Sequence, residues 1–153
     1  MKIYRIHCRQ ELKTDLKTAW EFLSNPKNLC NITPDHMKFE IVSGAEKEMY
    51  AGQLIQYVVC PFPWMKTRWV TEITHVQEGS FFVDEQRFGP FRLWHHKHFL
   101  APSERGVVME DIVDYKIPFG YVGQLANHLI VGKQVKMIFD YRQEKLAALF
   151  GTP

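Results

Sequence analysis

The spacing of apolar residues predicts a strand and short helices at the start of the chain. Apolar and polar residues alternate over residues 2–12, the period-two pattern of a strand with one buried face. Thr14 can cap a helix that follows this strand and ends at residues 24–26. The apolar side of this helix consists of Leu16, Ala19, Trp20 and Leu23. A second short helical turn is predicted at residues 27–32.

The rest of the chain reads as six strands followed by one long helix. The strands, separated by Gly and Pro turn signals, are predicted at residues 38–42, 53–60, 66–76, 81–87, 92–100 and 107–115. After Pro118 the apolar residues step by three or four, which predicts a helix over residues 122–150. Its apolar positions are Leu125, Leu129, Gly132, Val135, Phe139, Leu146 and Leu149. These elements predict an α+β domain in which an antiparallel sheet curls around the final helix and leaves a cavity.

Composition and charge exclude several classes of protein. A chain of 153 residues, 46% hydrophobic and 24% charged, predicts one domain, residues 1–153, with a core that needs no disulfide. The net charge is only +2 and the basic residues are scattered, so we expect no nucleic-acid partner. No apolar stretch approaches the roughly 18 residues of a membrane span, which argues against integral membrane association. A homodimer is compatible with these features.

The cysteines and the missing motifs narrow the chemistry. Cys8, Cys30 and Cys60 lack CxxC spacing and follow no cleavable signal, so we expect unpaired thiols in the cytoplasm. The sequence has no Gly-rich phosphate loop, GxSxG elbow or HExxH motif, and we expect no cofactor and no metal. Its aromatic content, 14%, is higher than a plain core requires. This excess indicates a lined cavity or an adhesive face.

Five ordered segments resemble a known superfamily. They are residues 20–23 (WEFL), 28–34 (with NL and ITP at its ends), 89–99 (GPFRLWHHKHF), 114–118 (DYKIP) and 138–142 (IFDYR). The chain resembles the START-like superfamily, also called SRPBCC or helix-grip, and within it the small bacterial single-domain ligand-binding proteins. The resemblance implies a helix-grip fold: about seven curved strands around a long C-terminal helix, with two short helices after strand one. It also implies a hydrophobic cavity between sheet and helix.

Three histidines in the strand 92–100 are the residues most able to do chemistry. They are His95, His96 and His98. His96 and His98 share a strand face and could hold a metal ion with Asp111 or Glu110 as a third ligand. Alternatively, they form a hydrogen-bonded ladder on a half-buried face, or a polar patch inside an apolar cavity. Such a patch would orient a ligand or act as general acid or base.

Strand register decides among these alternatives. Guided by the cavity of the superfamily, we predict that Trp94, His96 and His98 point inward, together with the Asp111 and Tyr115 face of the next strand. A shift of one residue would reverse this orientation. The expected ligand-binding residues are Trp69, Trp94, His96, His98, Asp111, Tyr115, Leu129 and Phe139. In the helix, Arg142 is expected to pair with a carboxylate such as Asp114, or with an anionic ligand.

Three functions are consistent with the sequence. The favoured one is non-catalytic binding of a hydrophobic small molecule or lipid in the cavity. The second is an enzyme of the cyclase or dehydratase kind, with His96 or His98 moving a proton and Asp111 fixing the tautomer. The third is a protein-interaction or regulatory module. Its aromatic tip would be residues 60–65, which are also expected to edge the cavity mouth with Tyr50 and residues 119–121.

Overall fold

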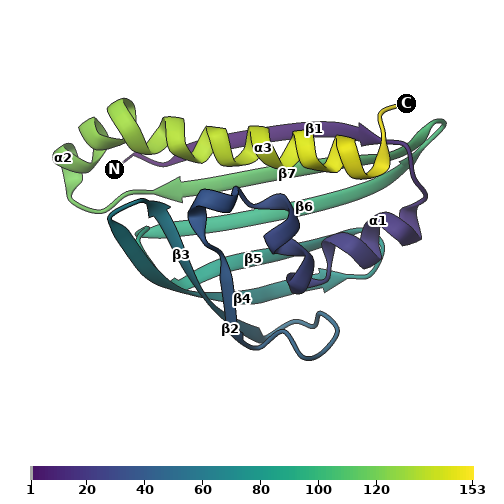
Figure 1. Cartoon of the computed structure of the whole chain (residues 1–153), viewed down its shortest axis with the longest axis horizontal. Helices are drawn as coiled ribbons and strands as arrows, with labels where there is room; N and C mark the ends of the chain where they lie inside the picture. Colours follow the sequence, from purple (N-terminus) through teal and green to yellow (C-terminus); the bar gives the residue numbers. More distant parts are fainter. Residues whose placement is uncertain (1) are drawn as a thin grey trace.

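A computed structural model describes residues 2–153 and confirms the predicted α+β architecture, a curved sheet around a C-terminal helix (Figure 1). The strands are β1 (Tyr4–Leu12), β2 (Glu40–Ser43), β3 (Gln53–Phe62), β4 (Met65–Gln77), β5 (Phe81–Phe88), β6 (Leu93–Ser103) and β7 (Gly106–Lys116). They form one sheet in the order β1-β7-β6-β5-β4-β3-β2, and every neighbouring pair is antiparallel. This is the helix-grip fold.

The helical elements lie in two parts of the chain. They are α1 (Leu16–Leu23), η1 (Pro26–Ile32), η2 (Asp35–Met37), α2 (Gly120–Ala126), η3 (Asn127–Val131) and α3 (Gly132–Phe150). Elements α2, η3 and α3 form one continuous rod that packs against β1 and η1. In Figure 1, α1 lies near the C-terminal end of this rod and α2 lies at the opposite end of the molecule. In the described residues, no helix combines the length and the apolar character needed to cross a bilayer.

Asp15, rather than the predicted Thr14, caps helix α1. Its carboxylate accepts hydrogen bonds from the backbone N–H of Thr18 at 2.9 Å and from the Thr18 hydroxyl at 2.7 Å. Both residue types can cap a helix, but the one-residue shift puts a stronger, charged acceptor opposite the first free N–H groups. The predicted apolar side is retained, since Ala19, Trp20 and Leu23 are buried.

The C-terminal helix departs from the prediction in its start and its phase. It begins at Gly120 rather than residue 122, and η3 is a π-helical turn. A π turn inserts one extra residue, which rotates the preceding residues by roughly 100° relative to α3. The predicted apolar seam therefore holds for Val135, Phe139 and Leu146, which are buried, but fails for Leu125 and Leu129, which are exposed. It also fails for Leu149, which is exposed in the last turn of α3, beyond the reach of the π turn.

Two hydrophobic clusters fill the interior, and polar residues separate them. On the inward face of β7, Met109 belongs to the first cluster and Val113 to the second. Asp111 lies between them and is 1% exposed. This break in the core marks the place where the fold buries charge.

Candidate functional site

A cavity of about 450 Å³ lies between the sheet and the C-terminal helix. Its size falls within the range of small-molecule pockets. Most of its walls are apolar side chains from η1, β3, β4, β6 and α3. Among the described residues that line it, the only acidic, basic or imidazole side chains are those of Asp84, His96, His98 and Arg142.

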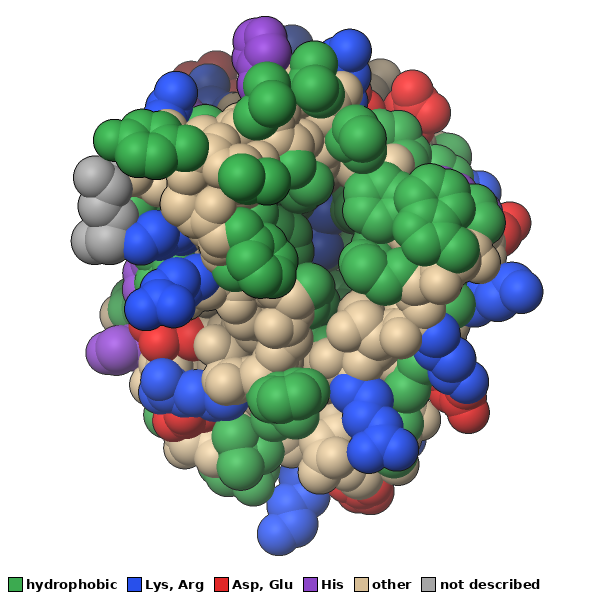
Figure 2. Space-filling model, turned by 90° about the vertical axis from the view of Figure 1, so that its left-hand side faces the viewer, with side chains coloured by type: hydrophobic (Ala, Val, Ile, Leu, Met, Phe, Trp, Pro, Cys, Tyr) green, Lys and Arg blue, Asp and Glu red, His purple; other side chains and the backbone are tan. Residues whose placement is uncertain are grey.

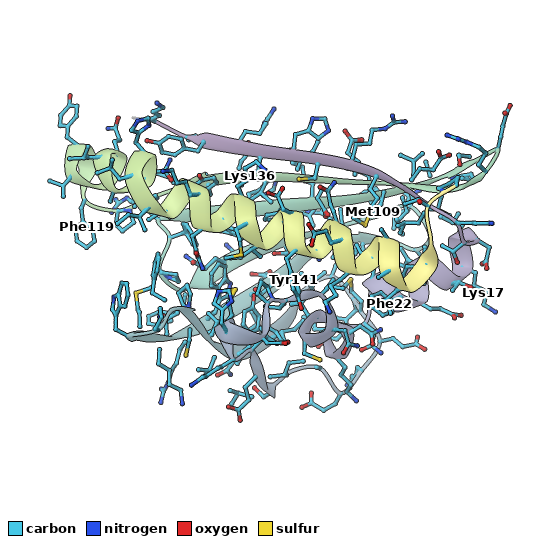
Figure 3. The ribbon with its side chains drawn as sticks, turned by 45° about the horizontal axis from the view of Figure 1, so that its top comes forward. Lys17, Phe22, Met109, Phe119, Lys136 and Tyr141 are labelled. Carbon is cyan, nitrogen blue, oxygen red and sulfur yellow. The ribbon has the colours of Figure 1, made fainter. Side chains whose placement is uncertain are left out.

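The cavity opens at the end of the molecule that carries α2 and the β3–β4 turn. Figure 2 shows a hollow at this end that is rimmed by hydrophobic side chains, with a basic side chain visible at its base. Arg142 is the only Lys or Arg that lines the cavity in the described residues. Phe119 lines the mouth and is 81% exposed, and Figure 3 shows it at the opposite end from Phe22. Of the expected mouth segment, Pro61, Phe62 and Met65 line the cavity, whereas Tyr50 does not.

The four acidic, basic or imidazole residues of the wall and Asp111 behind them form one cluster from three strands and a helix, which we call the polar cluster. It consists of Asp84 on β5, His96 and His98 on β6, Asp111 on β7 and Arg142 on α3. Asp84 is paired with His96 in the β5–β6 register, and His98 with Asp111 in the β6–β7 register. All four side chains therefore lie on one face of the sheet, and Arg142 covers them from the helix.

Each imidazole contacts both carboxylates. Nε2 of His96 lies 3.0 Å from Oδ1 of Asp111, and its Nδ1 lies 3.6 Å from Oδ2 of Asp84. Nε2 of His98 lies 2.6 Å from Oδ2 of Asp84, and its Nδ1 lies 2.9 Å from Oδ1 of Asp111. Nε of Arg142 donates to Oδ2 of Asp111 at 3.1 Å. The two rings are thus held between two carboxylates.

Burial and pairing set the protonation of the cluster. Burial alone would raise the pKa of Asp111, but the Arg142 charge and the two imidazoles hold that pKa well below its usual value. Burial and the neighbouring His98 lower the pKa of His96. Burial also opposes a charge on His98, yet Asp111 and Asp84 outweigh it and raise the pKa of His98. His98 is therefore the imidazole that carries a second proton most readily.

Aromatic packing fixes the two imidazole rings. His98 stacks on Phe82, with ring centroids 4.0 Å apart, and is tilted by 36° against His96, with centroids 3.6 Å apart. His96 contacts the edges of Phe139 at 5.4 Å and Trp94 at 6.3 Å. A ring enclosed in this way has little freedom to rotate, so its nitrogen atoms keep their directions.

The structure brings together most of the residues expected to bind a ligand, but not all. Trp69, Trp94, His96, His98 and Phe139 line the cavity. Asp111 and Tyr115 point inward as predicted, but both are buried behind the cavity wall. Leu129 does not line the cavity and is 55% exposed, because the π turn rotates it away. Ligand contact by any of these residues stays a prediction.

Two expected ionic partners are wrong. Arg142 pairs with Asp111 and not with Asp114, since Asp114 lies on the outer face of β7. There Asp114 accepts hydrogen bonds from Arg5 and Lys97. Glu110 was a possible third ligand beside His96 and His98, but it lies on that outer face too, 2.5 Å from His7.

Sequence reasoning missed Asp84, which occupies the place expected for Asp111 at the cavity wall. The signal was available, because Asp is uncommon inside strands and Asp84 shares a strand face with Phe82. The register between β5 and β6 could not be predicted, and without it Asp84 cannot be placed beside His96 and His98.

The part of the cavity wall formed by β3 and β4 also carries polar groups that sequence reasoning did not single out. The Tyr57 hydroxyl lies 2.7 Å from the Thr71 hydroxyl, and both residues line the cavity. Burial raises the pKa of Tyr57, so this phenol stays protonated. The indole N–H of Trp69 is buried without a hydrogen-bond partner among the described residues. A buried donor without an acceptor costs about 1–3 kcal/mol, and an acceptor on a bound molecule would offset this cost.

Comparison with known proteins gives the fold. No family model matches the sequence, and no curated protein matches it. Protein CV1439 from Chromobacterium violaceum is 16% identical with a TM-score of 0.73, and the match covers 98% of this chain and 99% of that one. Ginseng major latex-like protein 151 from Panax ginseng is 12% identical with a TM-score of 0.70, covering 97% of each chain. Protein TTHA0849 from Thermus thermophilus is 14% identical with a TM-score of 0.66, covering 95% and 99%. These structures share a fold with this chain over nearly its whole length.

Proposed function

We propose that this chain is a single ligand-binding domain, residues 1–153, that holds one small hydrophobic molecule or lipid between the sheet and the C-terminal helix. The observation that carries this proposal is the apolar cavity of about 450 Å³, whose charged groups gather on one part of the wall. Burial of an apolar body supplies affinity, at about 25 cal/mol per Å², and a few fixed polar groups supply orientation. The free thiols of Cys8, Cys30 and Cys60 are compatible with a cytoplasmic location, which we also propose.

The wall groups favour a ligand with an oxygen acceptor at one end. Arg142 is a permanent cation at the cavity, and His98 donates readily when protonated. The N–H of Trp69, which has no partner among residues 2–153, adds a further donor beside the apolar region. A carboxylate, carbonyl or enolate oxygen matches these donors, whereas a cationic head group does not.

A substitution that fills the cavity with a larger side chain tests the proposal. We expect 1-anilinonaphthalene-8-sulfonate, which has an apolar body and an anionic group, to bind the wild-type chain saturably at one site. Ala126 lines the cavity, so Ala126→Phe should weaken this binding about tenfold or more, the equivalent of roughly 1.4 kcal/mol. Leu129→Phe is the matched control, because Leu129 lies outside the cavity nearby. Equal binding by all three proteins would contradict the proposal.

A second candidate function is proton-transfer catalysis on the bound molecule. It is favoured by the 2.6 Å contact between His98 Nε2 and Asp84 Oδ2, because both residues line the cavity. An imidazole paired with a carboxylate is the usual arrangement of a general acid or base. In this version Asp84, rather than Asp111, is the carboxylate at the reacting end. Turnover lost in His98→Asn, with binding of the same substrate retained, would favour catalysis over binding alone.

A further inference from the structure

Three side chains of the polar cluster converge on one small volume at the cavity wall. One ligand atom each from Asp84, His96 and His98 lies within 4.8 Å of the others. Both imidazoles direct a nitrogen at the same carboxylate oxygen, Oδ2 of Asp84, at 3.6 Å for His96 and 2.6 Å for His98. All three residues come from neighbouring strands, so the sheet itself fixes their separation.

The opposite edges of the two rings are held by Asp111. This carboxylate only accepts, so its hydrogen bond at 3.0 Å places a proton on Nε2 of His96. Nδ1 of His98 lies 2.9 Å from the same oxygen and 3.5 Å from a guanidinium nitrogen of Arg142. Nδ1 of His96, which lies 3.6 Å from Asp84, is then a lone-pair donor in the neutral ring. Nε2 of His98 donates to Asp84 at 2.6 Å and becomes a lone-pair donor when a metal ion displaces that proton. A carboxylate behind a histidine is the usual outer partner of a metal-binding imidazole, because it fixes the tautomer and the ring direction. Arg142 in turn fixes Asp111.

The charges of the cluster require one more cation. With both imidazoles neutral, two carboxylates and one guanidinium leave a net formal charge of −1. All five side chains are at most 15% exposed, and an uncompensated buried charge costs several kcal/mol. A proton on His98 supplies this charge and links only His98 and Asp84. A metal ion would supply it and link Asp84, His96 and His98.

We propose that Asp84, His96 and His98 bind one divalent transition-metal ion, of the class that includes Zn²⁺ and Fe²⁺, at the wall of the cavity. Two imidazole nitrogens and one carboxylate oxygen suit these ions, whereas Mg²⁺ and Ca²⁺ prefer oxygen ligands alone. From the sequence alone, His96 and His98 are a possible metal site with Asp111 or Glu110, no metal is expected, and Asp84 is not identified as a ligand. Asp111 holds the two imidazoles from behind, in the outer shell.

A three-ligand site keeps a coordination position open, and here it faces the cavity, since all three ligands line it. The ion changes the formal charge of the cluster to +1 and so favours an anionic oxygen as the next ligand. Resting on the proposed function, this assigns the hydrophobic ligand a carboxylate or enolate group that binds at the metal. The rest of the molecule would extend toward the apolar mouth.

Titration of the metal-free protein with Co²⁺ tests the site, because absorption by the ion reports its coordination. We expect one Co²⁺ per chain, displaced by Zn²⁺. Asp84→Asn keeps the side-chain shape and should weaken binding by more than the roughly 10–100-fold that the loss of an outer-shell partner costs. Asp114→Asn, an outer-face control, should bind as wild type does. No saturable binding by the wild type, or equal affinity in Asp84→Asn, would overturn the proposal.

A second measurement uses the wild-type chain alone and so does not depend on a variant folding. Nitrogen-detected NMR of the histidine rings should show that one equivalent of Zn²⁺ perturbs His96 and His98 first. Perturbation confined to other histidines would overturn the site. Binding of 1-anilinonaphthalene-8-sulfonate to the metal-free protein is measured in parallel. If Co²⁺ fails to bind while the probe binds, the metal site is wrong and the proposed ligand binding stands. If Co²⁺ binds while the probe does not, the metal site stands and the proposed ligand binding is wrong.

Discussion

Arg142 and Asp111 are the most deeply buried pair of an Arg or Lys with a carboxylate in the described part of the molecule, with side chains 8% and 1% exposed. Arg142→Met keeps much of the side-chain volume but leaves Asp111 buried without its cation. We expect the free energy of unfolding to fall by about 3–5 kcal/mol, as measured by urea denaturation. Arg68→Met is the control, because Arg68 is exposed and should cost less than about 0.5 kcal/mol. Equal losses in both variants would contradict the assigned pair.

Substitution of the two cavity histidines tests whether they anchor a ligand. His96→Asn and His98→Asn each remove an imidazole that faces the cavity while keeping a hydrogen-bonding side chain. If these residues anchor the polar end of the ligand, probe affinity should fall about tenfold, the loss of one charge-assisted hydrogen bond. His95→Asn is the control, since His95 faces outward and pairs with Glu85. Affinity unchanged in both cavity variants would rule out an anchoring role.

Asp114 gives a pH dependence whose sign follows from its partners. Hydrogen bonds from Arg5 and then Lys97 hold the pKa of Asp114 below its usual value. The folded state therefore binds fewer protons here, and the stabilisation is complete above the unfolded pKa of about 3.9 and is lost as the pH falls through the folded pKa. The difference in unfolding free energy between wild type and Asp114→Asn should be constant near neutral pH and shrink below about pH 4. A difference that does not shrink as the pH falls below about 4 would contradict this assignment.

At the residue scale, the resemblance to the superfamily, and not the alternation itself, predicted which face of β6 points inward, and neither predicted the full site. Alternation alone groups Trp94, His96 and His98, and the structure places all three at the cavity. The partners of the histidines depend on register between strands far apart in sequence, so Asp84 was missed and Arg142 was given the wrong carboxylate. Short-range patterns specify a face but not the neighbour across it.

At the scale of elements, the π turn is the feature that shapes the cavity end of the molecule. The strands were predicted to within a few residues, because alternation and Gly or Pro turns are local signals. The phase of the helix was not predicted, because apolar residues spaced three or four apart do not reveal the extra residue of a π turn. Its effect is that Gly123 and Asn127 are buried in place of Leu125 and Leu129. Asn127 then accepts a hydrogen bond from the buried Tyr115 hydroxyl at 3.1 Å.

Gly123 of α2 lies close to the segment that leads from β7 into this helix. A Cβ at this position would lie 1.9 Å from the backbone oxygen of Pro118, so a side chain must displace the helix. We expect Gly123→Ala to cost about 1–3 kcal/mol, the usual penalty of overpacking, and to lower the melting temperature. Gln124→Ala, one residue along the same helix, is the control and should change stability little. A stabilised Gly123→Ala protein would show that α2 does not dock as described.

At the scale of the whole molecule, a sheet gripping one helix leaves volume that neither element fills. The two hydrophobic clusters close the core at both sides of the polar cluster, and the cavity occupies the space beside it. Its mouth is apolar, and its charged wall is neutral overall when His98 carries a proton. This combination of an apolar volume and a balanced polar wall is the property on which the proposed function depends.

Native mass spectrometry tests that function most directly. The chain is purified without detergent, its intact mass is measured, and the small molecules released on denaturation are identified, with Ala126→Phe in parallel. We expect about one apolar molecule bound per wild-type chain, either retained from purification or taken up from added decanoic acid, and much less on the variant. A wild-type chain that stays bare in excess decanoic acid, or a variant that binds equally well, would contradict binding in this cavity.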